Sequence, residues 1–497
     1  MGDTNEDTLQ DGPLVDRSGF GVRDVIRDVW TNVGLPKAAL DSLVLPGEED
    51  TGPIVPSSFK LGTLSHACLA LAALSASQVH ALRNGLKRVP NITVTRRHAT
   101  VEFKSERLYR LARVNKPLQY QLLGGLHRTN DGHVRIHDSF PNHVKAILGV
   151  LGLPGNANRE DIAKKTKNWA SIDLETTATV ESSAAAYALR SFQQWDSLPQ
   201  SKAISNLPIG LKQLAPGPAK FPSRMPPGQS RPLKGLRVVE MSRVIAAPLS
   251  GKTLAVHGAD VLWVTSPNLP DLPDLDREFS RGKRTIQLDI RDPSEKDKLL
   301  ELLRICDVFI QGYRPGSLAS HGLSPEKLVE ANPGIIIANL SAFGPQGPWS
   351  GRRGFDSLVQ TCSGMNVSEA EHAGQGESAR VLPSQALDHG AGYMLATGIM
   401  AAVHRRAVEG GAWQVDVSLA GVMKYLRSLG QYPGAEGFQC DDFNRPEDVP
   451  EEYFETNETG YGTMTTVRHA ASIDGCDVGW EIMPKPLGSD EARWLAP

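Results

Sequence analysis

Residues Leu233 to Val264 read LKGLRVVEMSRVIAAPLSGKTLAVHGADVLWV. The apolar runs LRVVEM and DVLWV are short and flanked by turn residues, as expected for parallel strands that are buried on both faces. A loop and a helical segment lie between them. The stretch therefore predicts a βαβ unit, and with it an α/β fold built on an open parallel sheet.

This unit carries no nucleotide-binding signature of the common kinds. It lacks GxGxxG, which argues against a Rossmann dinucleotide fingerprint, and the GKT at Gly251 to Thr253 lacks the preceding glycine spacing of a P-loop. The fold alone does not assign a reaction.

A second informative stretch, Leu382 to Leu419, reads LPSQALDHGAGYMLATGIMAAVHRRAVEGGAWQVDVSL. It places the carboxylate of Asp388 at the head of a long apolar helix rich in small residues. The positive end of the helix dipole and its unpaired N–H groups are expected to keep such a carboxylate ionised where water is scarce. Asp388 is thus a candidate nucleophile, although a simple N-cap is the commoner role of such an aspartate.

Composition limits the class of protein. The chain has 497 residues, of which 40% are hydrophobic and 22% charged, and this is typical of a globular protein with two or more domains. The net charge of -3 gives no reason to expect nucleic acid. No apolar run reaches the length of a membrane span, and Met1 to Asp16 lacks the regions of a signal peptide, so we expect a cytoplasmic protein. The five scattered cysteines indicate neither a disulfide framework nor a metal site.

Several breaks divide the chain. Residues 1–50 are acidic and rich in Gly and Pro, which predicts a flexible arm. Residues 216–232 are too rich in Pro and Gly for helix or sheet, which predicts a linker. After residue 430 the chain becomes acidic and irregular before a short ending with strand character.

The two sides of the linker share a faint repeat. Ser57 to Phe103 has the plan of the Asp388 segment: a small-residue helix ending in Val-His, a basic and Gly turn, then an alternating strand. The shared place of Val79-His80 and Val403-His404 favours duplication over chance. Leu64 stands where the later copy has Asp388, so only the later copy is predicted to hold a nucleophile.

Together, these segments resemble the class III (CaiB/BaiF) CoA-transferase family. The resemblance implies a Rossmann-like CoA-binding domain plus a smaller α+β domain, in a duplicated or rearranged form. Residues 51–215 would be a degenerate transferase half with the small domain, 233–430 the CoA-binding and catalytic half, and 431–497 a C-terminal segment. The halves are incomplete in different ways, and together they would make one transferase.

The resemblance also implies where CoA lies. The loop after the first strand, with Val244, Ile245 and Ala246, would run along the pantetheine, although Ile245 replaces a glutamine of formyl-CoA transferase-like members. The basic loop with Lys283 and Arg284 would meet the phosphates, although a solvated turn explains those charges equally well. Further expected contacts are Gln311, Gly312, Tyr313 and Arg353. Ser266 and Ser320 stand where the family usually has basic residues.

By the same resemblance, Asp388 would attack the thioester of a donor acyl-CoA, and CoA would pass to a small carboxylic acid through an aspartyl intermediate. CoA thioesters are then substrates, and no permanently bound cofactor is expected; a homodimer is possible. The motif RRGFDS has Phe355 where racemases of the superfamily have a basic histidine, which favours transfer over racemisation. An α-methylacyl-CoA racemase-like enzyme and a non-catalytic homologue remain the alternatives.

Overall fold

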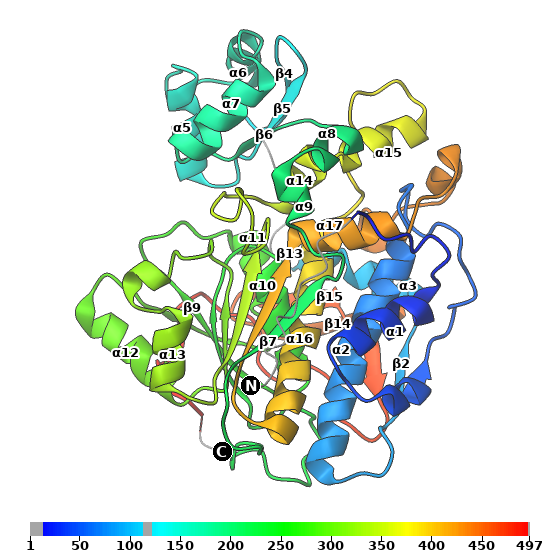
Figure 1. The fold of residues 1–497 in the computed structure, drawn as a ribbon, viewed down its shortest axis with the longest axis vertical. Helices are drawn as coiled ribbons and strands as arrows, with labels where there is room; N and C mark the ends of the chain where they lie inside the picture. Colours follow the sequence, from blue (N-terminus) through cyan, green and yellow to red (C-terminus); the bar gives the residue numbers. More distant parts are fainter. Residues whose placement is uncertain (1–12, 113–121, 496–497) are drawn as a thin grey trace, which may run out of the picture.

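The computed structural model describes residues 13–112 and 122–495. Its centre is a seven-stranded sheet with the order β10-β9-β8-β11-β12-β13-β7 (Figure 1). Six strands run parallel, and β7 pairs antiparallel with β13 at the edge. The strands are β7 (Ile209–Ala215), β8 (Arg237–Met241), β9 (Asp260–Thr265), β10 (Arg284–Gln287), β11 (Val308–Gln311), β12 (Ile336–Ser341) and β13 (Ala412–Ser418).

The predicted βαβ unit is confirmed. Its strands are β8 and β9, joined by helix α10 (Ala246–Val256), and they pair in parallel with Val238 opposite Val261. Val238, Val239 and Leu262 are fully buried, because helices cover both faces of the sheet. The open parallel sheet expected from the sequence is therefore present.

The order of the parallel strands reverses between β8 and β11. Open α/β sheets bind ligands outside the carboxyl ends of their strands at such a point. The chain leaving β11 closes tightly on β8 there, where Gly312 N donates to Met241 O at 3.0 Å. The remaining helices of this half are α11 (Pro273–Phe279), α12 (Pro293–Arg304), α13 (Pro325–Ala331), α14 (Asp356–Cys362), α15 (Met365–Ala373), α16 (Ala386–Glu409) and α17 (Leu419–Ser428).

Two long helices, α2 (Leu61–Asn84) and α16, pack against each other beside the sheet (Figure 1). Each has 24 residues and is buried on almost every side, which suits helices that are apolar all round. Their N-caps have nearly the same backbone angles: φ −75° and ψ 59° at Lys60, φ −77° and ψ 60° at Gln385. The pair thus supports the predicted repeat.

The repeat differs from its prediction in two details. The strand expected over residues 92–103 is only β2 (Ile92–Val94), followed by helix α3 (Arg96–Glu102). The later copy has the same plan, since α16 is followed by β13 and α17. When the helices are aligned by their N-caps, Asp388 corresponds to Thr63 rather than Leu64.

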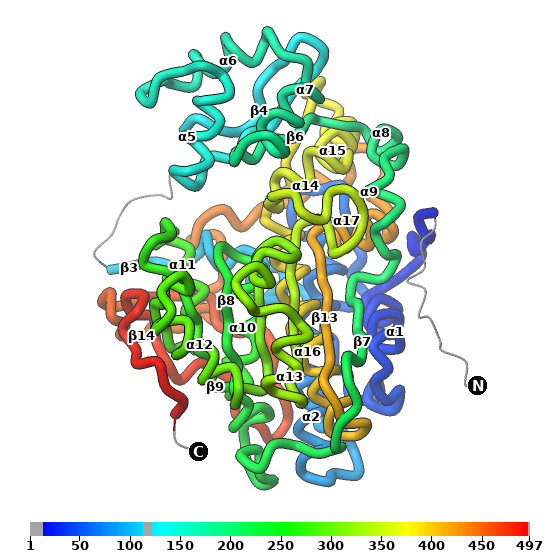
Figure 2. The backbone as a smooth tube through the Cα atoms, turned by 60° about the vertical axis from the view of Figure 1, so that its left-hand side comes forward, coloured from blue at the N-terminus to red at the C-terminus, as the bar shows by residue number. Residues whose placement is uncertain are grey.

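A smaller unit stands above the sheet (Figures 1 and 2). It contains an antiparallel sheet of order β4-β5-β6 and a core of its own around Val134, Ile147 and Leu174. Its elements are β4 (Gly125–Arg128), β5 (His133–Ile136), α5 (Pro141–Val150), α6 (Arg159–Thr166), α7 (Ser171–Thr176) and β6 (Ala186–Ala188). Two short helices, α8 (Phe192–Asp196) and α9 (Pro199–Lys202), lead back to β7.

The prediction of a flexible arm over residues 1–50 is wrong for residues 13–50, the part that the structure describes. Helix α1 (Val22–Asn32) is amphipathic and buries Val25, Ile26, Val29 and Trp30 completely. Its apolar face packs on α2, and this burial fixes the segment. Residues 1–12 lie outside the described residues.

The predicted segments interleave in space. The first half supplies β7 to the large sheet, while the C-terminal segment returns to the first half. There, β15 (Gly462–Val467) pairs with β14 (Phe454–Thr459) and β3 (Arg110–Leu111), and β16 (Ala471–Ile473) pairs with β2, which also pairs with β1 (Leu43–Val44). The predicted linker, residues 216–232, contains neither helix nor strand. Within the described ranges, no helix is both long and apolar enough to cross a membrane.

Candidate active site

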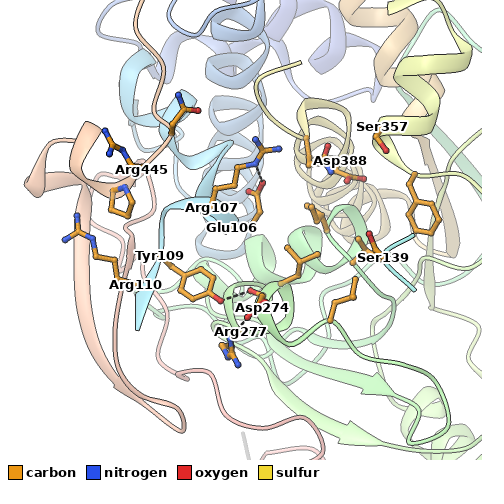
Figure 3. Close-up of a pocket in the computed structure, with 18 of the residues that line it drawn as sticks. Glu106, Arg107, Tyr109, Arg110, Ser139, Asp274, Arg277, Ser357, Asp388 and Arg445 are labelled. Carbon is orange, nitrogen blue, oxygen red and sulfur yellow. Dashed lines mark hydrogen bonds and ion pairs between the residues drawn. The ribbon is translucent and has the colours of Figure 1, made fainter. Parts of the chain in front are cut away.

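A cavity of about 1020 Å³ opens beside the carboxyl end of β8 (Figure 3). Its walls come from parts of the chain that are far apart in sequence: the loop after β8, the start of α16, helix α4 (Ser105–Leu108), the small unit and the C-terminal hairpin. Asp388, Val244 and Ile245 all line it. The cavity thus brings together three of the residues singled out from the sequence.

Asp388 lies in the first turn of α16, as predicted, but it is not the N-cap. The N-cap is Gln385, and Asp388 follows three residues later with 7% of its surface exposed. The capping explanation of Asp388 is therefore excluded. About one turn further along, α16 packs closely on the start of α10, since a Cβ on Gly392 would lie 2.7 Å from the carbonyl oxygen of Ala246.

A second carboxylate, Asp356, holds the start of α16. Its Oδ2 accepts hydrogen bonds from the backbone N of Leu387 at 2.8 Å and of Asp388 at 3.0 Å. The side chain of Gln360 donates to its Oδ1. Asp356 is fully buried, and this burial raises its pKa to about 6. Asp356 thus occupies the anion site at the positive end of the helix.

The electrostatic environment of Asp388 differs from the prediction. Burial, together with the nearby charges of Asp356 and Glu106, raises the pKa of Asp388 well above its usual value. The helix terminus does not offset this, because its N–H groups serve Asp356. The expectation that the helix end keeps Asp388 ionised is therefore wrong. Without bound substrate, the surroundings favour the protonated form of Asp388.

Next to Asp388, His389 forms a buried pair with Glu106 of α4. Its Nε2 lies 2.9 Å from Glu106 Oε2, and both side chains are at most 2% exposed. Burial works against the charge of Glu106, but His389 and the neighbouring Arg107 hold the pKa of Glu106 at about 2. His389 is thus the partner of a carboxylate, and the first half of the chain supplies that carboxylate to the site.

The facing wall is the loop from β8 into α10. Val244 has φ 74°, a conformation that is costly for a β-branched residue. Such strain is typical of residues that the surrounding structure holds in place at functional sites. Ala246 is buried as the first residue of α10, directly behind the loop.

The predicted phosphate-binding charges lie elsewhere. Lys283 is buried and pairs with Glu240 at 2.8 Å, and Arg284 pairs with Asp260 at 2.8 Å. Neither is among the residues that line the cavity. The C-terminal segment covers this loop, where Gly282 N donates to Ile482 O at 2.8 Å.

The other expected CoA contacts also lie outside the cavity lining. Gln311 donates to Asn339 at 2.9 Å and accepts from the backbone of Tyr313. Gly312 is packed against α10, where an added Cβ would lie 3.0 Å from that of Ala247. Arg353 is partly buried, in the loop before α14. The structure therefore brings Gln311, Gly312 and Tyr313 to the switch point of the sheet but not to the Asp388 cavity.

Sequence reasoning missed His137 of the small unit. Its ring stacks on Phe355 with centroids 3.7 Å apart and planes 5° apart, and both residues line the cavity. Burial and the nearby charges of His143 and Arg135 lower the pKa of His137 to about 3. Nδ1 of His137 has no hydrogen-bond partner among the described residues. The neutral imidazole of His137 therefore lies beside Phe355, the position at which the motif lacks a histidine.

Little in the sequence could have revealed these contributions. Glu106 and His137 come from the half that was interpreted as degenerate, and no local motif marks them. Asp356 lies within the motif RRGFDS, where only Arg353 and Phe355 were interpreted.

Part of the sequence is similar to known CoA-transferases. Residues 233–468 match the model of CoA-transferase family III. An acyl-CoA transferase of Gibberella moniliformis is 30% identical over 61% of this chain and 56% of its own length. An acetyl-coenzyme A transferase of Hypoxylon pulicicidum is 26% identical over 78% of this chain and 72% of its own. The chain thus spans little more than half of the first relative.

Among solved structures, a CaiB/BaiF family protein from Brucella suis is similar at 26% identity, with a TM-score of 0.35, over 47% of this chain and 65% of that one.

Proposed function

Because residues 233–468 match the model of CoA-transferase family III, we propose that this protein moves CoA from an acyl-CoA donor to a small carboxylic acid by way of Asp388. The observation that carries this proposal is a buried carboxylate in a cavity of about 1020 Å³, facing the strained loop after the first parallel strand. Among the described residues, no group donates a hydrogen bond to the carboxylate of Asp388. Its oxygens are therefore not engaged by protein donors, and once ionised they can attack a bound thioester.

The reaction begins with attack of an Asp388 oxygen on the thioester carbonyl. The attacking form is the carboxylate, so Asp388 first loses its proton; the C–S bond then breaks, and a mixed anhydride and free CoA thiolate form. The CoA sulfur then attacks the aspartyl carbonyl and releases the donor acid, which leaves an aspartyl-CoA thioester. The acceptor carboxylate repeats the two steps in reverse, and acyl-CoA leaves with Asp388 restored.

The developing oxyanion needs donors on the facing wall. The backbone N–H groups of Ala246 and Ala247 open α10, and the first turn of a helix has no intrahelical acceptors for such groups. The N–H groups of Leu387 and Asp388 are not available, because they bind Asp356. We therefore assign the oxyanion to the start of α10, with Val244 and Ile245 along the pantetheine.

Trapping tests this proposal. The protein is incubated with short acyl-CoAs, quenched with hydroxylamine and digested, and a hydroxamate is sought by mass spectrometry. We expect it on Asp388 in the wild type and none in Asp388→Asn. Glu369→Gln, which changes another buried carboxylate that does not line the cavity, should label normally. Absence of label from a protein that binds CoA would refute the covalent mechanism.

A second candidate is favoured by the stacking of His137 on Phe355. With Asp388 and the imidazole of His137 as the two acid–base groups, the site would exchange the α-proton of a 2-methylacyl-CoA, as a racemase does, although the lowered pKa of His137 makes it a weak base. Deuterium uptake from heavy water into that substrate, lost in His137→Gln, would establish this activity. Its absence together with hydroxamate at Asp388 would leave transfer alone. A protein that shows neither activity would be a non-catalytic homologue.

A further inference from the structure

The cavity is polar at the end away from Ser139 and Ser357. Figure 3 shows Arg110 and Arg445 together at that end, with Arg277 lower and nearer the middle, next to Asp274. These three arginines come from three separate segments: β3, α11 and the chain before β14. Their convergence on one cavity follows from the return of the C-terminal segment onto the first half.

The acidic partners of Arg110 and Arg277 occupy only some of the N–H donors of each guanidinium. Arg110 Nη2 lies 3.4 Å from Glu447, and Arg277 Nη1 lies 2.6 Å from Asp274. Each guanidinium offers five N–H donors. The buried Nε atoms of Arg110 and Arg277 have no acceptor within residues 13–112 and 122–495. The protein covers these Nε atoms, so a ligand in the cavity would meet the Nη groups, which carry the exposed part of each guanidinium and form strong charge-assisted hydrogen bonds to anions.

Arg445 completes the group from a more exposed position. Its side chain is 76% exposed, and its guanidinium is 3.8 Å from Asp448, which is a weak pair. It is therefore free to close on a ligand that reaches this end of the cavity.

We propose that Arg110, Arg277 and Arg445 form an anion-binding subsite for the end of the substrate remote from Asp388. The inference rests on the proposed function and deepens it. Lys283 and Arg284 are held in internal ion pairs, so the anionic part of a substrate needs other cations. Arginine forks suit both candidate groups, a phosphate of CoA and the far carboxylate of a dicarboxylic acid.

Binding measurements distinguish the two sources. Full-length Asp388→Asn protein, which cannot turn over, is titrated by calorimetry with CoA against pantetheine and with glutarate against butyrate. In Arg110→Met/Arg277→Met we expect the preference for the anionic member of one pair to fall at least about tenfold, the loss of one charge-assisted contact. A fall for CoA identifies the phosphate, and a fall for glutarate identifies the carboxylate.

Two variants guard this test against misfolding. Arg445→Met changes a largely exposed side chain and should lower the same preference without altering the melting temperature. Arg493→Met, an exposed arginine paired with Glu491, should change neither. Unchanged ratios for both pairs, or no preference for either anion in the parent protein, would overturn the subsite. Failure of the proposed function appears separately, as no binding of CoA and pantetheine alike.

Discussion

Asp356 Oδ2 accepts a hydrogen bond from the backbone N of Asp388 at 3.0 Å. With Leu387 N and the side chain of Gln360, three donors converge on Asp356. In the described part of the chain none donates to the carboxylate of Asp388. When two neighbouring acids share one negative charge, the charge settles on the acid with the donors. Asp356 therefore keeps the charge, and Asp388 keeps the proton.

Asp356→Asn should make Asp388 a stronger acid. Its raised pKa holds Asp388 in the unreactive acid form below that pKa. Removing the adjacent charge lowers this pKa, so the acid limb of the rate of covalent labelling should move to lower pH. We expect a shift of about one unit or more, the usual effect of a charge at this range. The measurement is the initial rate of hydroxamate formation between pH 5 and 9.

The control for this variant is Glu369→Gln. Glu369 is another buried acid whose pKa is raised by burial, but it is hydrogen-bonded to Ser58 rather than to α16. Neutralising Glu369 should leave the acid limb of the labelling rate at the same pH. If both variants, or neither, shift the limb, then Asp356 does not set the ionisation of Asp388.

Loss of the carboxylate in Glu106→Ala should strongly destabilise the protein. Removing one partner of a buried pair costs roughly 3–5 kcal/mol, and here it leaves His389 buried without an acceptor. Because the pKa of Glu106 is held at about 2, below its usual 4.5, its contribution is present above about pH 4.5 and is lost as the pH falls toward 2. Urea unfolding at pH 7 and pH 3 measures both effects.

Glu106→Gln keeps an acceptor for His389 and should lose less stability than Glu106→Ala. Equal losses in the two variants, or a loss from Glu106→Ala that does not diminish at pH 3, would contradict the ion-pair account.

The sequence predicted what depends on local pattern. The βαβ unit from Leu233 to Val264 and the helix that begins beside Asp388 follow from runs of neighbouring residues, and both are present. Partners distant in sequence were not predictable. His389 depends on Glu106, which lies 283 residues earlier. A local pattern also cannot reveal that residues near Ile482 cover the basic loop of Lys283.

The same limit explains the errors about the site. A helix N-terminus stabilises a carboxylate, but only the packed structure shows that Asp356 rather than Asp388 occupies it. The interpretation of Phe355 as the loss of a base likewise needed the position of His137, which comes from another unit.

Gly392→Ala should impair both stability and acyl transfer. The added methyl group would lie 2.7 Å from Ala246 O and 2.8 Å from Leu249 Cβ, so α10 and α16 must separate. Such overpacking costs about 1–3 kcal/mol, and it widens the gap between Asp388 and the facing amides. Gly149→Ala, a helical glycine with nothing within 4 Å, should be neutral or slightly stabilising. The measurements are the denaturation midpoints and labelling rates of the two variants. Equal midpoints and equal rates would contradict the close packing of α10 on α16.

Asp276 in α11 should make stability depend on pH. Burial and the nearby charge of Asp271 raise its pKa from 3.8 to about 7. Below about pH 3.8 both folded and unfolded states hold the proton, so its contribution is fully present. Between the two values only the unfolded chain ionises, and the free energy of unfolding falls by about 1.4 kcal/mol per pH unit. Asp276→Asn removes this slope, so the variant should gain on the wild type between pH 4 and 7 in urea titrations. Asp271→Asn should lower the pKa of Asp276 and so narrow the pH range over which stability falls. A constant difference between Asp276→Asn and the wild type across this range would disprove the assignment.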